Sequence, residues 1–309
     1  MRFDTLSERD SGIVGDVYRY RYLSTSQVQR LHFAERASQT PGYRALARLT
    51  RLKLIAPFTV PNVPERIYRL TDSGAGFLAD ERGVEVSSLR LHTPRRKPPR
   101  FYHFMRHFLG VGDVRIEIER AVGKRDDVSS PLWIPEYASR QYASGRPVSL
   151  LQATVQTRHG PLSHTPDAAF ILETNGSSKG EERGERASGL FFLEYDRGTE
   201  SLTNPDKGVL RFVRFYEAAL QATAQGQGPY DALRRHSAAL RPLFRVLVVC
   251  ESEKRLASMR ARLTASQDVV APSVLRFFWG TTSPMADPLA APWCSLLRSD
   301  EEAYRLAAA

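Results

Sequence analysis

The chain has 309 residues, a formal net charge of +10 and a pI of about 9.8. This charge favours a polyanionic partner such as nucleic acid or an acidic membrane surface. The segment Met1 to Ser11 is polar and no run of about 18 apolar residues follows, so neither a signal peptide nor a membrane span is expected. Two cysteines without a Cys-x-x-Cys spacing exclude a zinc cluster and suit a reduced, cytoplasmic setting.

The charge is distributed unevenly. Residues 1–100 carry 18 Lys and Arg against 10 Asp and Glu, a net +8, whereas residues 101–200 carry 12 against 14, a net −2. A DNA-binding segment before an acidic, metal-binding segment would have this distribution, and so would an ordinary surface. Nearly all the basic side chains are Arg, whose forked guanidinium suits phosphate and base recognition.

The first ninety residues predict three helices, a β-hairpin and a fourth helix. Apolar spacing, capping residues and turn residues place the boundaries. The expected ranges are helices over 12–22, 24–31 and 41–54, strands over 57–60 and 66–70, and a helix over 71–83. This order resembles a winged helix-turn-helix domain, in which the third helix would enter the DNA major groove and the hairpin would touch the backbone.

The third predicted helix has a basic face. Arg44, Arg48 and Arg51 lie beside its apolar stripe, and Arg66 lies on the predicted wing. We expect these four residues to contact double-stranded DNA. Two alternatives stay open: a solvated basic face on a structural helix, and a winged helix that binds another protein.

Residues 91–100 are rich in Pro and basic side chains, which excludes a helix or a central strand. They predict a linker between a domain over residues 1–90 and a domain over residues 101–309. The expected elements of the second domain are a helix over 101–122 interrupted at Gly110 and Gly112, strands over 132–136, 148–157, 168–172 and 190–195, a helix over 205–221, a strand over 244–250, a helix over 251–263 and a strand over 274–279.

An antiparallel meander followed by a crossover into a further strand resembles the restriction-endonuclease-like fold. The fold class is therefore expected to be α/β (α+β), with an N-terminal winged helix-turn-helix followed by a restriction-endonuclease-like mixed-sheet domain.

Two apolar runs of the second domain, 166–172 and 191–200, contain carboxylates near one end. In a hairpin that pairs residue 172 with residue 190, Asp167 would lie opposite Tyr195. Glu194 and Asp196 would flank that position on one face of the sheet.

Carboxylates crowded against an apolar sheet repel each other, and a divalent cation removes the repulsion. Oxygen ligands suit Mg²⁺ or Mn²⁺, so Asp167 and Glu194 are the expected metal ligands. The alternative is a rim of acids that caps the sheet and pairs with Arg197 and Arg211.

The nuclease signature of this fold is Pro-Asp, a gap, and then Glu-x-Lys. Here Asp196 stands where the signature has Lys. Another cation would have to supply that charge, either Lys207 in the first turn of the next expected helix or Arg197.

Several strings together resemble the replication-relaxation family, whose members occur on plasmids and integrative elements and are related to relaxases without a His-hydrophobic-His site. The resemblance spans roughly residues 10 to 250. The strings that carry it are the winged-helix start, His107 to Val114, Trp133 to Glu136, Pro166-Asp167 and Phe192 to Glu200.

The resemblance implies a metal-dependent DNA endonuclease or nickase that acts at a plasmid or element origin during replication or mobilisation. It implies that Asp167 and Glu194 bind the metal and that Asp196, Glu200 and Lys207 complete the site. His107 and Asp113 would contribute from a neighbouring helix, and His107 is equally compatible with a structural role.

Two other functions stay open. One is a non-catalytic origin-binding or regulatory protein with a decayed nuclease domain, which the missing lysine favours. The other is a host or defence nuclease of the same fold. The oligomeric state, monomer or homodimer, is also left open.

Overall fold

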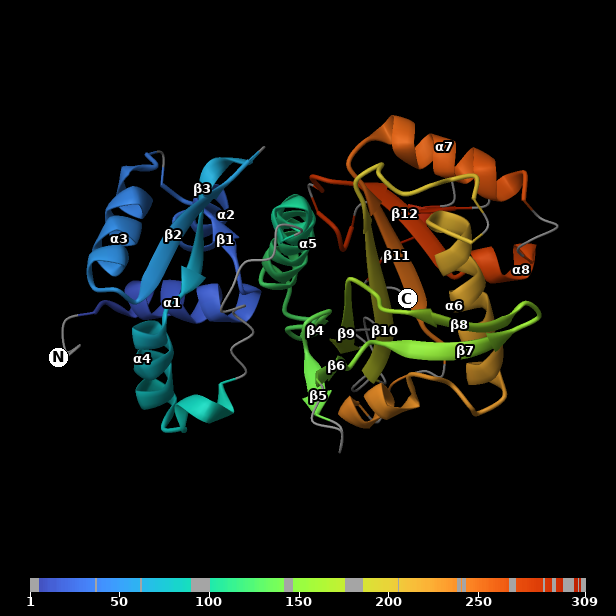
Figure 1. Ribbon diagram of the computed structural model, residues 1–309, viewed down its shortest axis with the longest axis horizontal. Coiled ribbons are helices and arrows are strands. Elements are labelled where there is room, and N and C mark those ends of the chain that lie inside the picture. Colours follow the sequence, from blue (N-terminus) through green and yellow to red (C-terminus); the bar gives the residue numbers. More distant parts are fainter. Residues whose placement is uncertain are drawn as a thin grey trace, which may run out of the picture. The chain divides into compact units, whose positions relative to one another are not determined.

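The computed structural model divides the chain into two compact units, Met1–Ile116 and Glu117–Ala309 (Figure 1). The structure describes residues 6–36, 38–61, 63–89, 101–141, 147–175, 186–204, 206–237, 240, 243–266, 271–285, 287–290, 293–296, 303–304 and 306.

The first unit contains the elements that the sequence predicts. Its short sheet has the strand order β1-β3-β2, with both pairs antiparallel. The elements are α1 (Glu8–Tyr20), β1 (Leu23–Ser24), α2 (Thr25–His32), α3 (Thr40–Arg51), β2 (Ile55–Val60), β3 (Val63–Leu70), α4 (Asp72–Arg82) and a 3-10 turn, η1 (Val86–Ser88).

Local sequence explains several of these boundaries. Ser24 and Gln27 form a reciprocal capping box that starts α2. Thr71 caps α4 through its hydroxyl, which accepts from the Gly74 N–H. The left-handed Gly83 ends the same helix.

The domain boundary differs from the expected one. Residues 91–100, the predicted linker, lie outside the described residues, and the division between the units falls inside α5 (Phe101–Val122). The cause is packing, because the N-terminal part of α5 contributes to the first unit's core. Met105 packs with Tyr22 and Ile67, and Ile116 joins the main cluster of buried residues.

The second unit is built on a seven-stranded sheet of order β14-β13-β12-β11-β10-β9-β4. Strands β4, β9 and β10 are antiparallel neighbours, and β11 and β12 continue from β10 in parallel. The strands are β4 (Leu132–Pro135), β9 (Ala168–Asn175), β10 (Arg186–Asp196), β11 (Arg245–Cys250), β12 (Phe278–Thr282), β13 (Trp293–Ser295) and β14 (Ala303–Tyr304).

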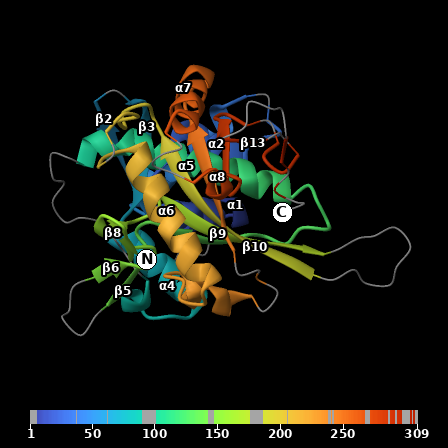
Figure 2. The ribbon, with the colours of Figure 1, turned by 90° about the vertical axis from the view of Figure 1, so that its right-hand side faces the viewer.

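Two small hairpins and further helices complete this unit. Helix α6 lies over one face of the sheet (Figure 2), and both α6 and α7 bury apolar side chains in one cluster with Phe192, Val246 and Val248. The remaining elements are β5 (Ser139–Gln141), β6 (Pro147–Ser149), β7 (Ala153–Thr157), β8 (Gly160–His164), α6 (Val209–Ala224), η2 (Asp231–His236), α7 (Glu253–Thr264) and α8 (Pro272–Leu275).

The register of the β9–β10 hairpin differs by one residue from the predicted one. Leu172 pairs with Gly189 rather than with residue 190, and the Asp167 N–H donates to the Leu193 carbonyl at 3.1 Å. The last pair of this ladder is Ala168 with Leu193, so Asp167 lies just before β9 and is not paired with Tyr195 as predicted. Both strands are apolar on both faces, so residue alternation could not distinguish two registers one residue apart.

Other expected boundaries also shift. Helix α5 runs without interruption through Gly110 and Gly112. The expected strand over 148–157 is divided between β6 and β7, and residues 274–275 belong to α8, which Pro272 starts at its first position. Within the described part of the chain, no helix is long and apolar enough to cross a lipid bilayer.

Gly208, which precedes α6, is expected to be indispensable for the stability of the second unit. Its φ is +66°, and a Cβ there would lie 2.3 Å from the Ser201 carbonyl oxygen. Gly208→Ala should lower the free energy of unfolding by about 2 to 4 kcal/mol, the left-handed strain plus the overpacking. Denaturant titration measures this.

Gly226→Ala is the matched control, because Gly226 has φ +75° and no atom within 4 Å of its added Cβ. Gly226→Ala should lower the free energy of unfolding by about 1 kcal/mol, which is the backbone strain alone. Equal losses for the two variants would contradict the importance of the Ser201 contact.

Candidate functional site

A buried carboxylate cluster lies at the end of β10 in the second unit. Glu194 is 7% exposed, and its Oε1 is 2.6 Å from His164 Nε2 and accepts from the Tyr216 hydroxyl at 2.6 Å. His164 is the last residue of β8, and Tyr216 lies on α6. Three elements thus converge on one oxygen atom.

Aromatic packing holds His164 in place. Its ring lies 5.2 Å from the ring of Phe215 and 5.5 Å from that of Tyr216, measured between centroids, and it stacks at 6.3 Å on Phe212. All three aromatic residues belong to α6. The imidazole is therefore fixed against the helix while its Nε2 reaches Glu194.

Burial governs the protonation of this cluster. Burial alone lowers the pKa of His164, but the Glu194 carboxylate and the hydrogen bond to it raise that pKa above its ordinary value. Burial raises the pKa of Glu194, while His164 and Tyr216 oppose the rise. Burial and the Glu194 charge hold the pKa of Tyr216 well above its usual range, so this phenol is a hydrogen-bond donor and not an ionised nucleophile.

The pH dependence of stability follows from these shifts. A raised His164 pKa contributes stability that is complete below the unfolded value of 6.5 and is lost as pH rises through the folded value. The raised pKa of Glu194 has the same sign, because a buried ionised carboxylate is costly. In EDTA, the melting temperature should fall as the pH rises above 6.5, and it should fall more steeply for the wild type than for His164→Gln. Parallel pH profiles would contradict the His164–Glu194 pairing.

Asp167 lies next to this cluster. Its Oδ2 accepts from the Tyr195 backbone N–H at 2.7 Å, which fixes the carboxylate at the start of β9. Its charge raises the pKa of Glu194 and of His164, so the two carboxylates act on each other. The Asp167 carboxylate lies beside the end of β10, because its partner Tyr195 is the residue after Glu194.

The two carboxylates can be tested as ligands of a divalent cation. Both recorded hydrogen bonds of Glu194 fall on Oε1, and its Oε2 has no hydrogen-bond partner among the described residues. Within the same residues, no group of three or more His, Cys, Asp or Glu side chains is arranged to hold a metal ion. A cation bound here would therefore have these two carboxylates as its ligands from the described residues, and water would have to supply the others, as is common for Mg²⁺.

Asp196 lies on the same face as Glu194, two residues further along β10, but its carboxylate has other partners. Its Oδ2 accepts from Arg255 Nε at 2.7 Å and its Oδ1 accepts from the Gly198 N–H at 2.7 Å. Arg255 also donates to the Glu200 carbonyl at 2.6 Å. These bonds organise the turn after β10, so Asp196 holds a loop in the position where the nuclease signature has Lys.

The other expected site residues are distributed more widely. Glu200 is exposed, and Lys207 is exposed in the turn before α6 rather than in the helix, because α6 begins at Val209. His107 belongs to the first unit, where its ring contacts Phe108. Asp113, also in the first unit, accepts from Gln27 at 2.8 Å and pairs with Arg30.

The predicted DNA contacts in the first unit fall into two groups. Arg44, Arg51 and Arg66 are exposed and have no ion pair with another described residue. Arg48 is 48% exposed and binds the carboxylate of Asp10, which is only 2% exposed. Arg48 therefore neutralises a buried charge, whereas the other three are available to an external anion.

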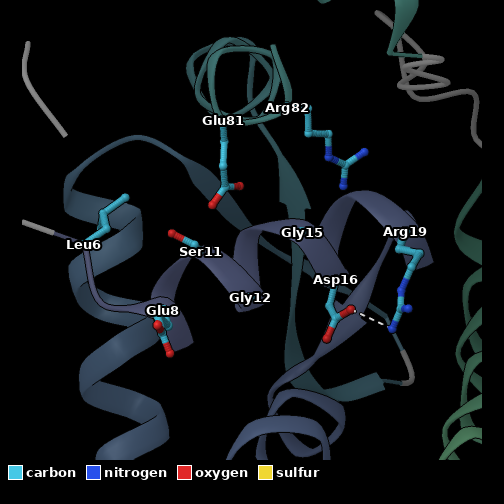
Figure 3. Close-up of a pocket in the computed structure, with 9 residues that line it drawn as sticks. All are labelled: Leu6, Glu8, Ser11, Gly12, Gly15, Asp16, Arg19, Glu81 and Arg82. Atoms are coloured by element: carbon cyan, nitrogen blue, oxygen red, sulfur yellow. Dashed lines mark ion pairs between the residues drawn. The ribbon is translucent and has the colours of Figure 1, made fainter. Parts of the chain in front are cut away.

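A concavity of about 520 Å³ lies between α1 and α4 in the first unit (Figure 3). Glu81 points from α4 toward α1, while Asp16 and Arg19 form an ion pair at 2.9 Å. Its lining mixes acidic and basic side chains with two glycines, and it includes none of the expected DNA contacts.

Sequence reasoning missed two members of the cluster. His164 lies three residues before Asp167, and this spacing was its one available signal. Tyr216 is buried on α6, and nothing in the helical pattern indicated Glu194 as its partner.

The chain therefore combines mixed α/β architecture, a basic helix in one unit, and in the other a buried Glu194 with the Asp167 carboxylate beside it. It belongs to the replication-relaxation family, whose sequence profile matches residues 15–230. This confirms the resemblance noted from the sequence, and it suggests a role in the replication or mobilisation of a plasmid or mobile element. No curated protein and no solved structure matches the chain.

Proposed function

We propose that the protein is a DNA-binding, metal-dependent endonuclease or nickase that acts at an origin of a plasmid or mobile element. The observation that carries the proposal is the Asp167 carboxylate held beside the buried Glu194 at the end of β10, where it binds the Tyr195 N–H and its charge raises the pKa of Glu194. The element order α5-β4-β9-β10-α6-β11, an antiparallel meander followed by a helical crossover into a parallel strand, supports a restriction-endonuclease-like core.

The first unit supports the DNA-binding part of the proposal. Its order of three helices, a hairpin and a further helix resembles a winged helix-turn-helix and supports this part of the proposal. Helix α3 would enter the major groove with Arg44 and Arg51, and Arg66 on β3 would touch the backbone. Such contacts are charge-assisted and position the protein on duplex DNA.

In the second unit, Asp167 and Glu194 would hold Mg²⁺ or Mn²⁺. The bound cation would supply Lewis acidity at the scissile phosphate. The chain's own residues orient the ligands: His164 and Tyr216 fix Glu194 through Oε1, and the Tyr195 N–H fixes Asp167 through Oδ2. Oriented ligands lose less entropy when they bind.

The direct test uses the purified full chain, supercoiled plasmid carrying the element's origin, and Mg²⁺ or Mn²⁺. Conversion to open circle that stops when EDTA removes the metal is the expected result. Supercoiled DNA that persists with either cation would refute the enzymatic proposal.

One observation favours a second candidate, an origin-binding or regulatory protein without catalysis. Asp196, bonded to Arg255, occupies the place of the signature lysine. If the wild type binds origin DNA and leaves it intact under the conditions above, this candidate replaces the first.

A further inference from the structure

The carboxylate site needs a positive charge that Asp196 cannot provide. Hydrolysis of a phosphodiester adds the oxygen of water to phosphorus, breaks one P–O bond and transfers a water proton to the leaving oxygen. Negative charge grows on the phosphoryl and leaving oxygens in the transition state. A positioned cation lowers the barrier by stabilising that charge.

Three of the nearby arginines are already neutralised by carboxylates. Arg255 binds Asp196 at 2.7 Å, Arg197 lies 3.5 Å from Glu251, and Arg214 lies 3.6 Å from Asp206, measured between nitrogen and oxygen. Lys207 is exposed in the turn before α6.

Arg211 differs from all of them. It lies in the first turn of α6, and its Nη2 donates to the main-chain carbonyl of Ser163, the residue before His164. This partner is neutral, and no carboxylate among the described residues pairs with Arg211. The guanidinium thus keeps its full charge beside the residue that binds Glu194.

We propose that Arg211 contacts the DNA phosphodiester at the Asp167–Glu194 site and supplies the positive charge that the nuclease signature assigns to lysine. Helix α6 carries both Arg211 and Tyr216. The same helix therefore orients the Arg211 guanidinium and, through Tyr216, the Glu194 carboxylate. Arg211 also influences the cluster electrostatically, since its charge opposes protonation of His164. This inference rests on the proposed nuclease function.

The test compares Arg211→Gln, Arg211→Lys and the control Arg214→Gln, which removes a neutralised charge one turn further along α6. Gln keeps an amide that can donate to the Ser163 carbonyl, so folding should persist, as thermal melting would verify. At saturating DNA, Arg211→Gln should nick at least about 100-fold more slowly than the wild type, because electrostatic groups of this kind contribute that much. Arg211→Lys should recover part of the rate, and Arg214→Gln should match the wild type.

A second readout needs no cleavage. In EDTA, Arg211→Gln should reduce the slope of log affinity against log salt by about 0.9, the value for one lost phosphate contact. Wild-type nicking rates and an unchanged slope in Arg211→Gln would overturn the role of Arg211 and leave the nuclease proposal standing. A wild type that never nicks would overturn the nuclease proposal and the catalytic role of Arg211 with it.

Discussion

Glu194→Gln should abolish nicking, with a loss of at least about 100-fold in rate. Gln preserves the size of the side chain and an acceptor for the Tyr216 hydroxyl, but it removes the charge that would bind a divalent cation. Asp167→Asn should have the same effect, since Asn can still accept from the Tyr195 N–H. The measurement is conversion of supercoiled to open-circle DNA at saturating Mg²⁺.

The matched control is Asp206→Asn. Asp206 lies before α6 with its side chain 84% exposed, so loss of its charge should leave nicking unchanged. Raising Mn²⁺ should partly restore Asp167→Asn if the defect is weakened metal binding. If Glu194→Gln nicks DNA at the wild-type rate, Glu194 takes no part in the reaction.

The double change Arg44→Ala and Arg51→Ala should weaken binding to duplex DNA by about tenfold or more. Both side chains are exposed on α3 without an ion-pair partner among the described residues, so their charges can displace counterions from DNA. The slope of log affinity against log salt should fall by about 0.9 for each phosphate contact that is lost. Fluorescence anisotropy over a salt series measures both quantities.

Arg48→Ala should behave differently from these two changes. It leaves the buried Asp10 carboxylate without its partner and should cost about 1 to 3 kcal/mol of stability. Weaker DNA binding by Arg48→Ala could therefore result from lower stability of the fold as well as from loss of a contact to DNA. If the Arg44/Arg51 double variant keeps the wild-type affinity and salt slope, the first unit instead suits a protein partner.

Local patterns predicted the first unit well. Caps and helical periodicity depend on residues three or four apart, and Ser24 with Gln27 or Thr71 with Gly74 could be recognised without any tertiary contact. The boundary inside α5 could not be recognised in this way, because it depends on which core buries Met105 and Ile116. The Pro-rich composition of residues 91–100 instead predicted a domain boundary before α5.

The site was predictable only in part for a similar reason. Asp167 and Glu194 were visible as acids at the ends of apolar strands, and the hairpin brought them together in spite of the one-residue error in register. His164 reaches Glu194 from a different hairpin, and Arg255 reaches Asp196 across 59 positions of sequence. Neither contact can be recognised in the sequence from the periodicity or from residues close together in the chain.

The Asp196–Arg255 bond has a consequence for comparing members of this family. The string from Glu194 to Glu200 is the most recognisable part of the chain, yet Asp196 within it fastens the turn after β10 to α7. A related sequence that keeps this aspartate and its arginine but lacks Asp167 would be expected to fold and to be inactive. A search profile dominated by this string would therefore weigh the fold together with one residue of the proposed site, and the residue equivalent to Asp167 would have to be checked separately.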